Sequence, residues 1–138
     1  MAALNHRTHR RRRGLATIET AIVLPLLLLL TAGILEYGWM FLKYQEVTNA
    51  TRHGARVGAT VDAGSAEVNQ AIADAMTASG LGGSGYTVTI SPSVDGLSSG
   101  ALFTVTVSVN YDNIGLDMPL TPTPANVSAS LTMMKEGP

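Results

Sequence analysis

The sequence contains no cysteine and little charge, and both absences narrow what the chain can do. Without cysteine it can form neither a disulfide framework nor a thiolate metal site. Only 14% of its 138 residues are charged. No Cys–His pair, metal-spaced cluster or carboxylate pair beside a pocket-forming loop marks a catalytic centre. We therefore expect a protein that is not an enzyme and that carries no metal and no cofactor.

The few charges are unevenly distributed. Residues 1–14 carry five Arg and no acid, whereas the remainder has four basic residues against ten acidic ones, a balance of about −6. Phosphate contacts need Lys and Arg, so we expect no nucleic-acid partner. An Arg run in front of an apolar segment instead favours a cytoplasmic N-terminus.

A membrane-spanning helix is predicted directly after Gly14. Residues 20–35 contain no charge and span about 24 Å as a helix. The apolar character continues to Lys43, so the segment can cross a hydrocarbon core of about 30 Å. We predict a basic leader over 1–14, a transmembrane helix over 15–42 and an extracytoplasmic domain over 43–138. The plausible aromatic residues of the outer interface are Tyr37, Trp39 and Tyr44.

Three residues of this helix are candidates for a special role. A carboxylate in the membrane costs several kcal/mol unless it is paired or protonated, which singles out Glu19 and Glu36. A peptidase that cuts after Gly14 would give Leu15 a free ammonium group one helical turn from Glu19. Alternatively, either glutamate lies at a boundary and reaches headgroup water. Pro25 removes a backbone hydrogen bond and is expected to bend the helix.

The helix is predicted to continue to about residue 59 with a face of small residues. Ala50, Gly54 and Gly58 recur every four residues, and such a face lets another backbone approach closely. Arg52 and Arg56 line another face and could meet acidic residues of a neighbouring subunit. We predict that this part of the helix packs on the sheet of its own domain and on neighbouring subunits; packing within the chain alone is the alternative.

The remaining residues predict an α+β domain. Ser65 is a suitable N-cap for a second helix over about 66–79, which Gly80 can end. Alternating apolar residues predict antiparallel strands over 86–91, 103–111 and 127–133. Residues 80–85 match the pattern G-x-G-x-x-G, but they follow a helix and precede a strand, so they indicate a linker and no phosphate site. The predicted class is α+β: a long N-terminal helix, one short helix and a small antiparallel sheet.

The order of basic leader, Gly14, apolar run and Glu19 at the fifth position after the glycine resembles the TadE-like family of pilin-related membrane proteins. Residues 49–56 (NATRHGAR) extend the resemblance, which covers about 14–59 and has the prepilin type of N-terminus. It implies cleavage between Gly14 and Leu15, pairing of Glu19 with the new terminal amine, a kink or melted turn at Pro25 on assembly, and a pilin-like fold.

The resemblance also implies a function. TadE-like proteins are minor pseudopilins of Tad (Flp-type) pili, which serve surface adhesion and biofilm formation. The implied partners are a prepilin peptidase, other TadE- and TadF-like pseudopilins, the Flp major pilin, the inner-membrane pilus platform and membrane lipid. The implied location is the bacterial cytoplasmic membrane, crossed once, or the pilus itself.

Three other interpretations remain open. The chain could be a permanently anchored extracytoplasmic binding module, which would keep residues 1–14 and would not need Glu19. It could be an anchored enzyme, which would require a pocket with titratable groups. It could also carry a signal peptide cut after Gly33, although the residues before that position match the usual small-residue pattern poorly.

Overall fold

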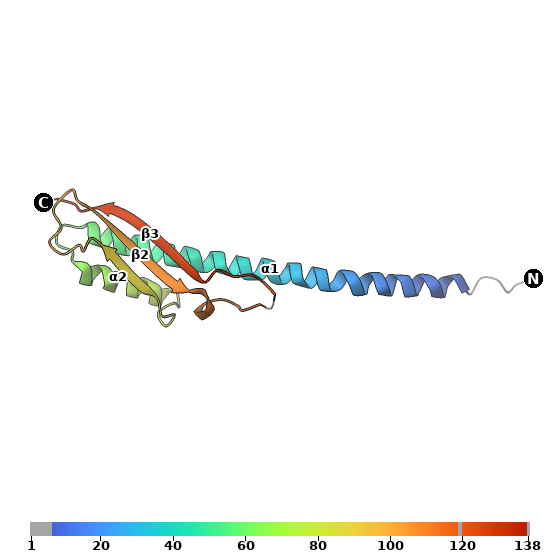
Figure 1. Cartoon of the computed structure of the whole chain (residues 1–138). Coiled ribbons are helices and arrows are strands. Elements are labelled where there is room, and N and C mark those ends of the chain that lie inside the picture. The colour runs from blue at the N-terminus through green and yellow to red at the C-terminus, as the bar shows by residue number, and fades with distance from the viewer. Residues whose placement is uncertain (1–6, 119, 138) are drawn as a thin grey trace, which may run out of the picture.

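The computed structural model describes residues 7–118 and 120–137, so the first part of the predicted leader, residues 1–6, lies outside the described residues. Helix α1 (Arg7–Ala59) contains 53 residues and is about 80 Å long. It begins within the basic segment and passes through Gly14 without interruption, whereas the sequence suggested a start at the glycine. Arginine is a good helix former, and one glycine costs a helix only about 1 kcal/mol. Figure 1 shows α1 as the axis of the molecule, with the other elements around its C-terminal half.

Pro25 lies inside α1, and the helix continues on both sides of it. Proline has no N–H, so the carbonyl of Ala21 lacks its usual helical donor. One threonine on each side of Pro25 donates its hydroxyl to the carbonyl four residues earlier: Thr20 to Ala16 at 2.9 Å and Thr31 to Leu27 at 2.8 Å. A melted turn at Pro25 on assembly stays a prediction.

The N-terminus of helix α2 (Ser65–Ala78) is capped by the distant residue Asp95 together with Glu67 of its own first turn. Gly64 is the N-cap and Ser65 the first helical residue, so the prediction of Ser65 as the cap was wrong by one position. Glycine has no side chain to accept from the free N–H groups of the first turn. Asp95 supplies the acceptor: its Oδ1 lies 2.8 Å from the backbone N of Ser65. Glu67 accepts from the N–H of Gly64 at 3.0 Å.

The predicted stop at Gly80 has the geometry of a Schellman motif. Gly80 has a φ of +76°, a conformation that a side chain would strain. Its N–H donates to Thr77 at 3.0 Å, and the N–H of Leu81 donates to Met76 at 2.7 Å. Leu81 and Met76 are both buried. Gly80, the first residue of the glycine-rich stretch 80–85, therefore ends helix α2.

Three strands form one antiparallel sheet in the order β1 (Thr87–Ser91), β2 (Leu102–Asn110) and β3 (Asn126–Met134). Every second residue of β2 is buried: Phe103, Val105, Val107 and Val109. The opposite face carries hydroxyls, which pair between strands as Thr104 with Thr132 and Thr106 with Ser130. The α+β class is confirmed.

Tyr111 was predicted to extend the second strand, and this was wrong. The chain turns at Asn110 into a short 3₁₀ helix, η1 (Tyr111–Asn113). The side chain of Asn110 accepts from the N–H of Asp112 at 3.0 Å, and Ile114 N–H donates to Tyr111 at 3.0 Å. This turn leaves the side chain of Tyr111 buried.

The core lies between the sheet and the two helices (Figure 1). Two glycines of α1 allow the close approach. A Cβ on Gly58 would lie 2.9 Å from Val68 Cγ2 and 3.0 Å from the Phe103 ring, and a Cβ on Gly54 would overlap Ile72. Besides these, the buried apolar residues include Val47, Ala50, Ala55 and Ala59 of α1 and Met76 of α2.

Candidate functional site

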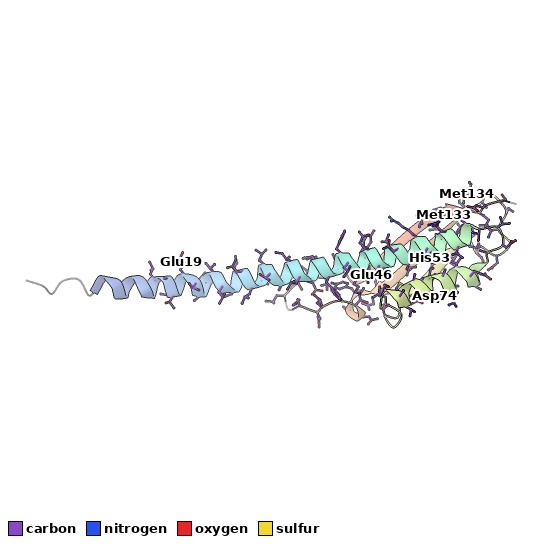
Figure 2. All side chains as sticks on the ribbon, turned by 180° about the vertical axis from the view of Figure 1, so that it is seen from behind. Glu19, Glu46, His53, Asp74, Met133 and Met134 are labelled. Carbon is purple, nitrogen blue, oxygen red and sulfur yellow. The ribbon has the colours of Figure 1, made fainter. Side chains whose placement is uncertain are left out.

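Residues 15–35 of α1 form an apolar stretch that extends beyond α2 and the sheet (Figure 2). Its large apolar side chains between residues 15 and 35 are all exposed, and the most apolar part of the helix is not buried at all. Figure 2 shows this part of the helix without a strand or second helix beside it. Residues 15–35 span about 30 Å, the thickness of a hydrocarbon core. This helix fits a single-pass membrane anchor.

Glu19 lies on this bare part of α1, far from α2 and the sheet (Figure 2). Its side chain is exposed, and within the described residues no hydrogen-bond or ion-pair partner is found for it. The backbone nitrogen of Leu15 is one helical turn away, because residues four apart are neighbours on a helix. In the uncut chain that nitrogen belongs to a peptide bond inside α1. Pairing of Glu19 with a new amine at Leu15 stays a prediction.

Glu36 has a different environment: it is completely buried, with a side-chain exposure of 0%. The hydroxyl of Tyr111 donates to its Oε1 at 2.7 Å, and the backbone N–H of Met118 donates to its Oε2 at 3.1 Å. These two donors supply the hydrogen bonds that a buried carboxylate needs. Burial, followed by the hydrogen bond to Glu36, raises the pKa of Tyr111, which therefore stays a neutral donor.

Two aromatic side chains of α1 close to Glu36 form hydrogen bonds with the loop that contains Tyr111 and Met118. Tyr37 donates its hydroxyl to the carbonyl of Pro122 at 2.9 Å, and Trp39 donates its indole N–H to the carbonyl of Ile114 at 2.6 Å. We call residues 111–118 and 120–122 the juxtamembrane segment. This segment contacts α1 as early as Glu36, six residues before the end of the predicted transmembrane helix at 42. The folded domain therefore begins where the bare helix ends.

The small-residue face is occupied within the chain. Ala50, Gly54 and Gly58 are buried, and α2 and β2 fill the space beside the two glycines. Arg52 and Arg56 are exposed, and within the described residues no acidic side chain pairs with either. An ion pair joins Lys43 to Glu46 at 2.8 Å. Contacts of the two arginines with neighbouring subunits stay a prediction.

Two structural contacts were missed by sequence reasoning. Lys135 is buried, and its Nζ donates to the carbonyls of Gly58 at 3.3 Å and Ala63 at 2.6 Å. The N–H of Glu136 donates to the carbonyl of Ala59 at 2.8 Å. Together they satisfy the carbonyls of Gly58 and Ala59 at the end of α1 and of Ala63 in the turn after it, and they place a cation near that helix end. No local pattern marks Lys135, since its partners lie over 70 residues earlier.

The second missed contact is the cap at Asp95. The backbone N–H of Ser65, followed by the hydroxyls of Ser65 and Ser93, lowers the pKa of Asp95 to about 2. In the sequence, Asp95 before Gly96 indicated only a turn. Elsewhere in the described ranges, no group of three or more His, Asp or Glu side chains is placed to hold a metal ion.

These features define a class: an α+β protein on a single apolar helix that fits a membrane anchor and continues unbroken into the folded domain. The family model described as TadE-like protein matches residues 14–56, or 43 of the 138 residues. The TadE-like resemblance is thereby confirmed over the anchor and the first part of the packed helix. The match ends before α2 and the sheet. No curated protein and no solved structure matches the chain.

Proposed function

We propose that this protein is a minor pseudopilin, a structural and assembly component of a Tad (Flp-type) pilus. The matched TadE-like segment indicates association with such a pilus system. The finer role rests on the N-terminal half of α1, which presents an exposed apolar surface with a single carboxylate, Glu19, one turn after Leu15. That combination suits a helix that is cut after Gly14 and then packs among other helices in a membrane or fibre.

The proposed partners follow from this role. A prepilin peptidase removes residues 1–14 on the cytoplasmic side, and the domain beyond Leu35 lies outside the membrane. Related pseudopilins, the Flp major pilin and the pilus platform contact the mature chain, which carries out no catalysis itself. Adhesion and biofilm formation are the processes that such a pilus serves.

Processing can be tested with a matched pair of glycines. We would express the chain in its native host with Gly14→Leu or Gly33→Leu and measure the intact mass of the protein from membranes. The proposal predicts that wild type and Gly33→Leu begin at Leu15, whereas Gly14→Leu keeps its leader. A wild-type chain that begins at Ile34 would support a signal peptide instead, and an uncut wild-type chain would support a permanent anchor.

Assembly can be tested at Glu19 with its neighbour as the control. If Glu19 pairs with the new amine of Leu15, Glu19→Ala should be processed normally but should be lost from pili sheared off the cells. Thr20→Ala changes the next residue on the same bare helix and should be retained. An anchored binding module, the alternative function, predicts that both variants behave like wild type in every assay.

A further inference from the structure

The juxtamembrane segment carries two apolar side chains that point away from the core. Leu120 is 88% exposed, the largest value for any large apolar residue among the described residues, and Leu116 is 41% exposed. The backbone around them is nevertheless fixed. Met118 N–H is bound to Glu36, and the carbonyls of Ile114 and Pro122 are bound to Trp39 and Tyr37. The leucines are therefore held in place by contacts that α1 provides.

The position of the juxtamembrane segment relative to the membrane follows from the residues of α1 that it contacts. Its contacts on α1 are with Glu36, Tyr37 and Trp39, immediately after the bare stretch of residues 15–35. That stretch matches the hydrocarbon thickness of about 30 Å, so its outer end lies at the start of the headgroup layer. Figure 1 shows the loop after β2 reaching along α1 toward the N-terminus, farther than the sheet does. Leu116 and Leu120 thus lie at the level of the membrane surface.

The charge of the segment indicates how it meets that surface. Its charged residues are Asp112 and Asp117, both exposed, and residues 111–122 contain no Lys or Arg. Attraction to anionic headgroups is therefore excluded as the cause of contact. The remaining cause of contact is insertion of the two leucine side chains into the bilayer, because burying a leucine side chain in an apolar layer is favourable irrespective of headgroup charge.

We propose that the juxtamembrane segment is a second membrane contact, which inserts Leu120 and Leu116 through the outer headgroup layer to the edge of the hydrocarbon core of the bilayer that α1 spans. The inference rests on the anchor and topology of the proposed function. It adds a lipid-binding site in the folded domain. With two points of attachment, the domain would have a fixed orientation on the membrane.

The absence of cysteine makes a direct test possible. Single cysteines replace Leu120, Leu26 or Leu102 in the full chain, which is spin-labelled and reconstituted in nanodiscs of neutral phosphatidylcholine. Leu26 is a 70% exposed residue of the anchor, and Leu102 is a 61% exposed residue at the opposite end of β2 from the segment. Electron paramagnetic resonance then compares the accessibility of each label to oxygen, which enters lipid, and to a water-soluble nickel chelate.

The proposal predicts that the label at 120 favours oxygen in nanodiscs, less strongly than at 26, while the label at 102 favours nickel. The pattern should not change at 0.5 M salt, since charge is not its cause. A label at 120 that behaves like the one at 102 overturns the proposal. So does one shielded from both reagents, which would indicate a second copy or another protein over the segment.

Failure of the anchor is separately visible. If the label at 26 favours nickel, α1 does not span the bilayer, and both the anchor and this inference are wrong. The native fold of each variant is checked by the fluorescence of Trp39, whose indole N–H binds the segment. If Leu120→Cys loses that signal, Leu116→Cys provides the same measurement from the other leucine.

Discussion

The two halves of α1 contrast within one continuous helix. Residues 15–35 are mostly apolar, and their large apolar side chains are exposed. Residues 36–59 have one face buried in the core and another that is exposed, where the charged Arg52 and Arg56 follow apolar residues such as Phe41. The same helical backbone thus has two surroundings: the first half is left uncovered by the domain and fits a membrane anchor, and the second half packs on a protein core. An apolar stretch of sequence therefore does not by itself identify a protein core. In water, apolar side chains must be buried by other parts of the protein, whereas in a bilayer they can remain exposed to lipid.

The sharpest test of this contrast uses the two glutamates. Glu36→Ala removes the acceptor of a buried donor, the hydroxyl of Tyr111, and of a partly buried one, the N–H of Met118. We expect a loss of about 3 kcal/mol in the free energy of unfolding, because each unpaired buried donor costs 1–3 kcal/mol. Glu19→Ala should leave that free energy unchanged. Urea unfolding of the full chain in micelles, followed by Trp39 fluorescence, measures both, and equal effects would refute the contrast.

A matched pair of valines gives the next largest effect. Val47 is fully buried in the core, and Val23 is 45% exposed on the bare half. Val47→Ala leaves a small cavity and should destabilise the domain by roughly 2 kcal/mol. Val23→Ala should change the urea midpoint by less than the error of the measurement. A comparable shift for Val23→Ala would mean that the bare half contacts the domain.

A smaller effect is expected at the far end of the packed half. Lys135→Met keeps the aliphatic length but leaves the carbonyls of Gly58 and Ala63 without their donor. We expect a loss of about 1 kcal/mol. Lys43→Met is the control: Lys43 is also buried, but its partners within the described residues are the Glu46 side chain and the Trp39 ring and not backbone carbonyls, so the change should cost less. Thermal unfolding by circular dichroism ranks the two, and the opposite order would contradict the assigned cap.

The smallest effect concerns pH and Asp95. Its pKa falls from 3.8 to about 2 on folding, so the contribution of the carboxylate is complete above pH 3.8 and is lost as the pH falls toward 2. Between pH 5 and pH 2 the wild type should therefore lose more stability than Asp95→Asn, which cannot titrate there. Urea midpoints across that range provide the test, and parallel profiles would show that the cap at Ser65 is not charge-dependent.

The repeating parts of the fold could be predicted from the sequence. The strict alternation over residues 103–109 indicated a half-buried strand, and the charge-free run after Glu19 indicated a helix that could span a membrane. Both patterns are local, because each records which face of one element meets an apolar surface. Tyr111 continued the alternation in sequence, but the cap from Asn110 ended the strand one residue earlier.

The contacts that hold the domain to α1 could not be predicted in the same way. Glu36 and Tyr111 are 75 residues apart, and Tyr111 reaches its partner from an irregular turn with no periodicity. From the sequence, Glu36 therefore looked like a carboxylate near the outer interface of a membrane helix. Lys135 and Asp95 likewise bind backbone groups, whose positions depend on the completed fold.

The end contacts of the packed half have a mechanical consequence. The C-terminal part of the chain is hydrogen-bonded to α1 at two points: Tyr111 binds Glu36, and Glu136 binds Ala59. Strands β2 and β3 run between these two points. A force that pulls on the N-terminal half of α1 would act on the sheet as shear along the antiparallel strands, and it would load both hydrogen-bonded points at the same time. The domain should then resist extension as one unit until a high force breaks it, where a domain fastened at one end would peel open gradually.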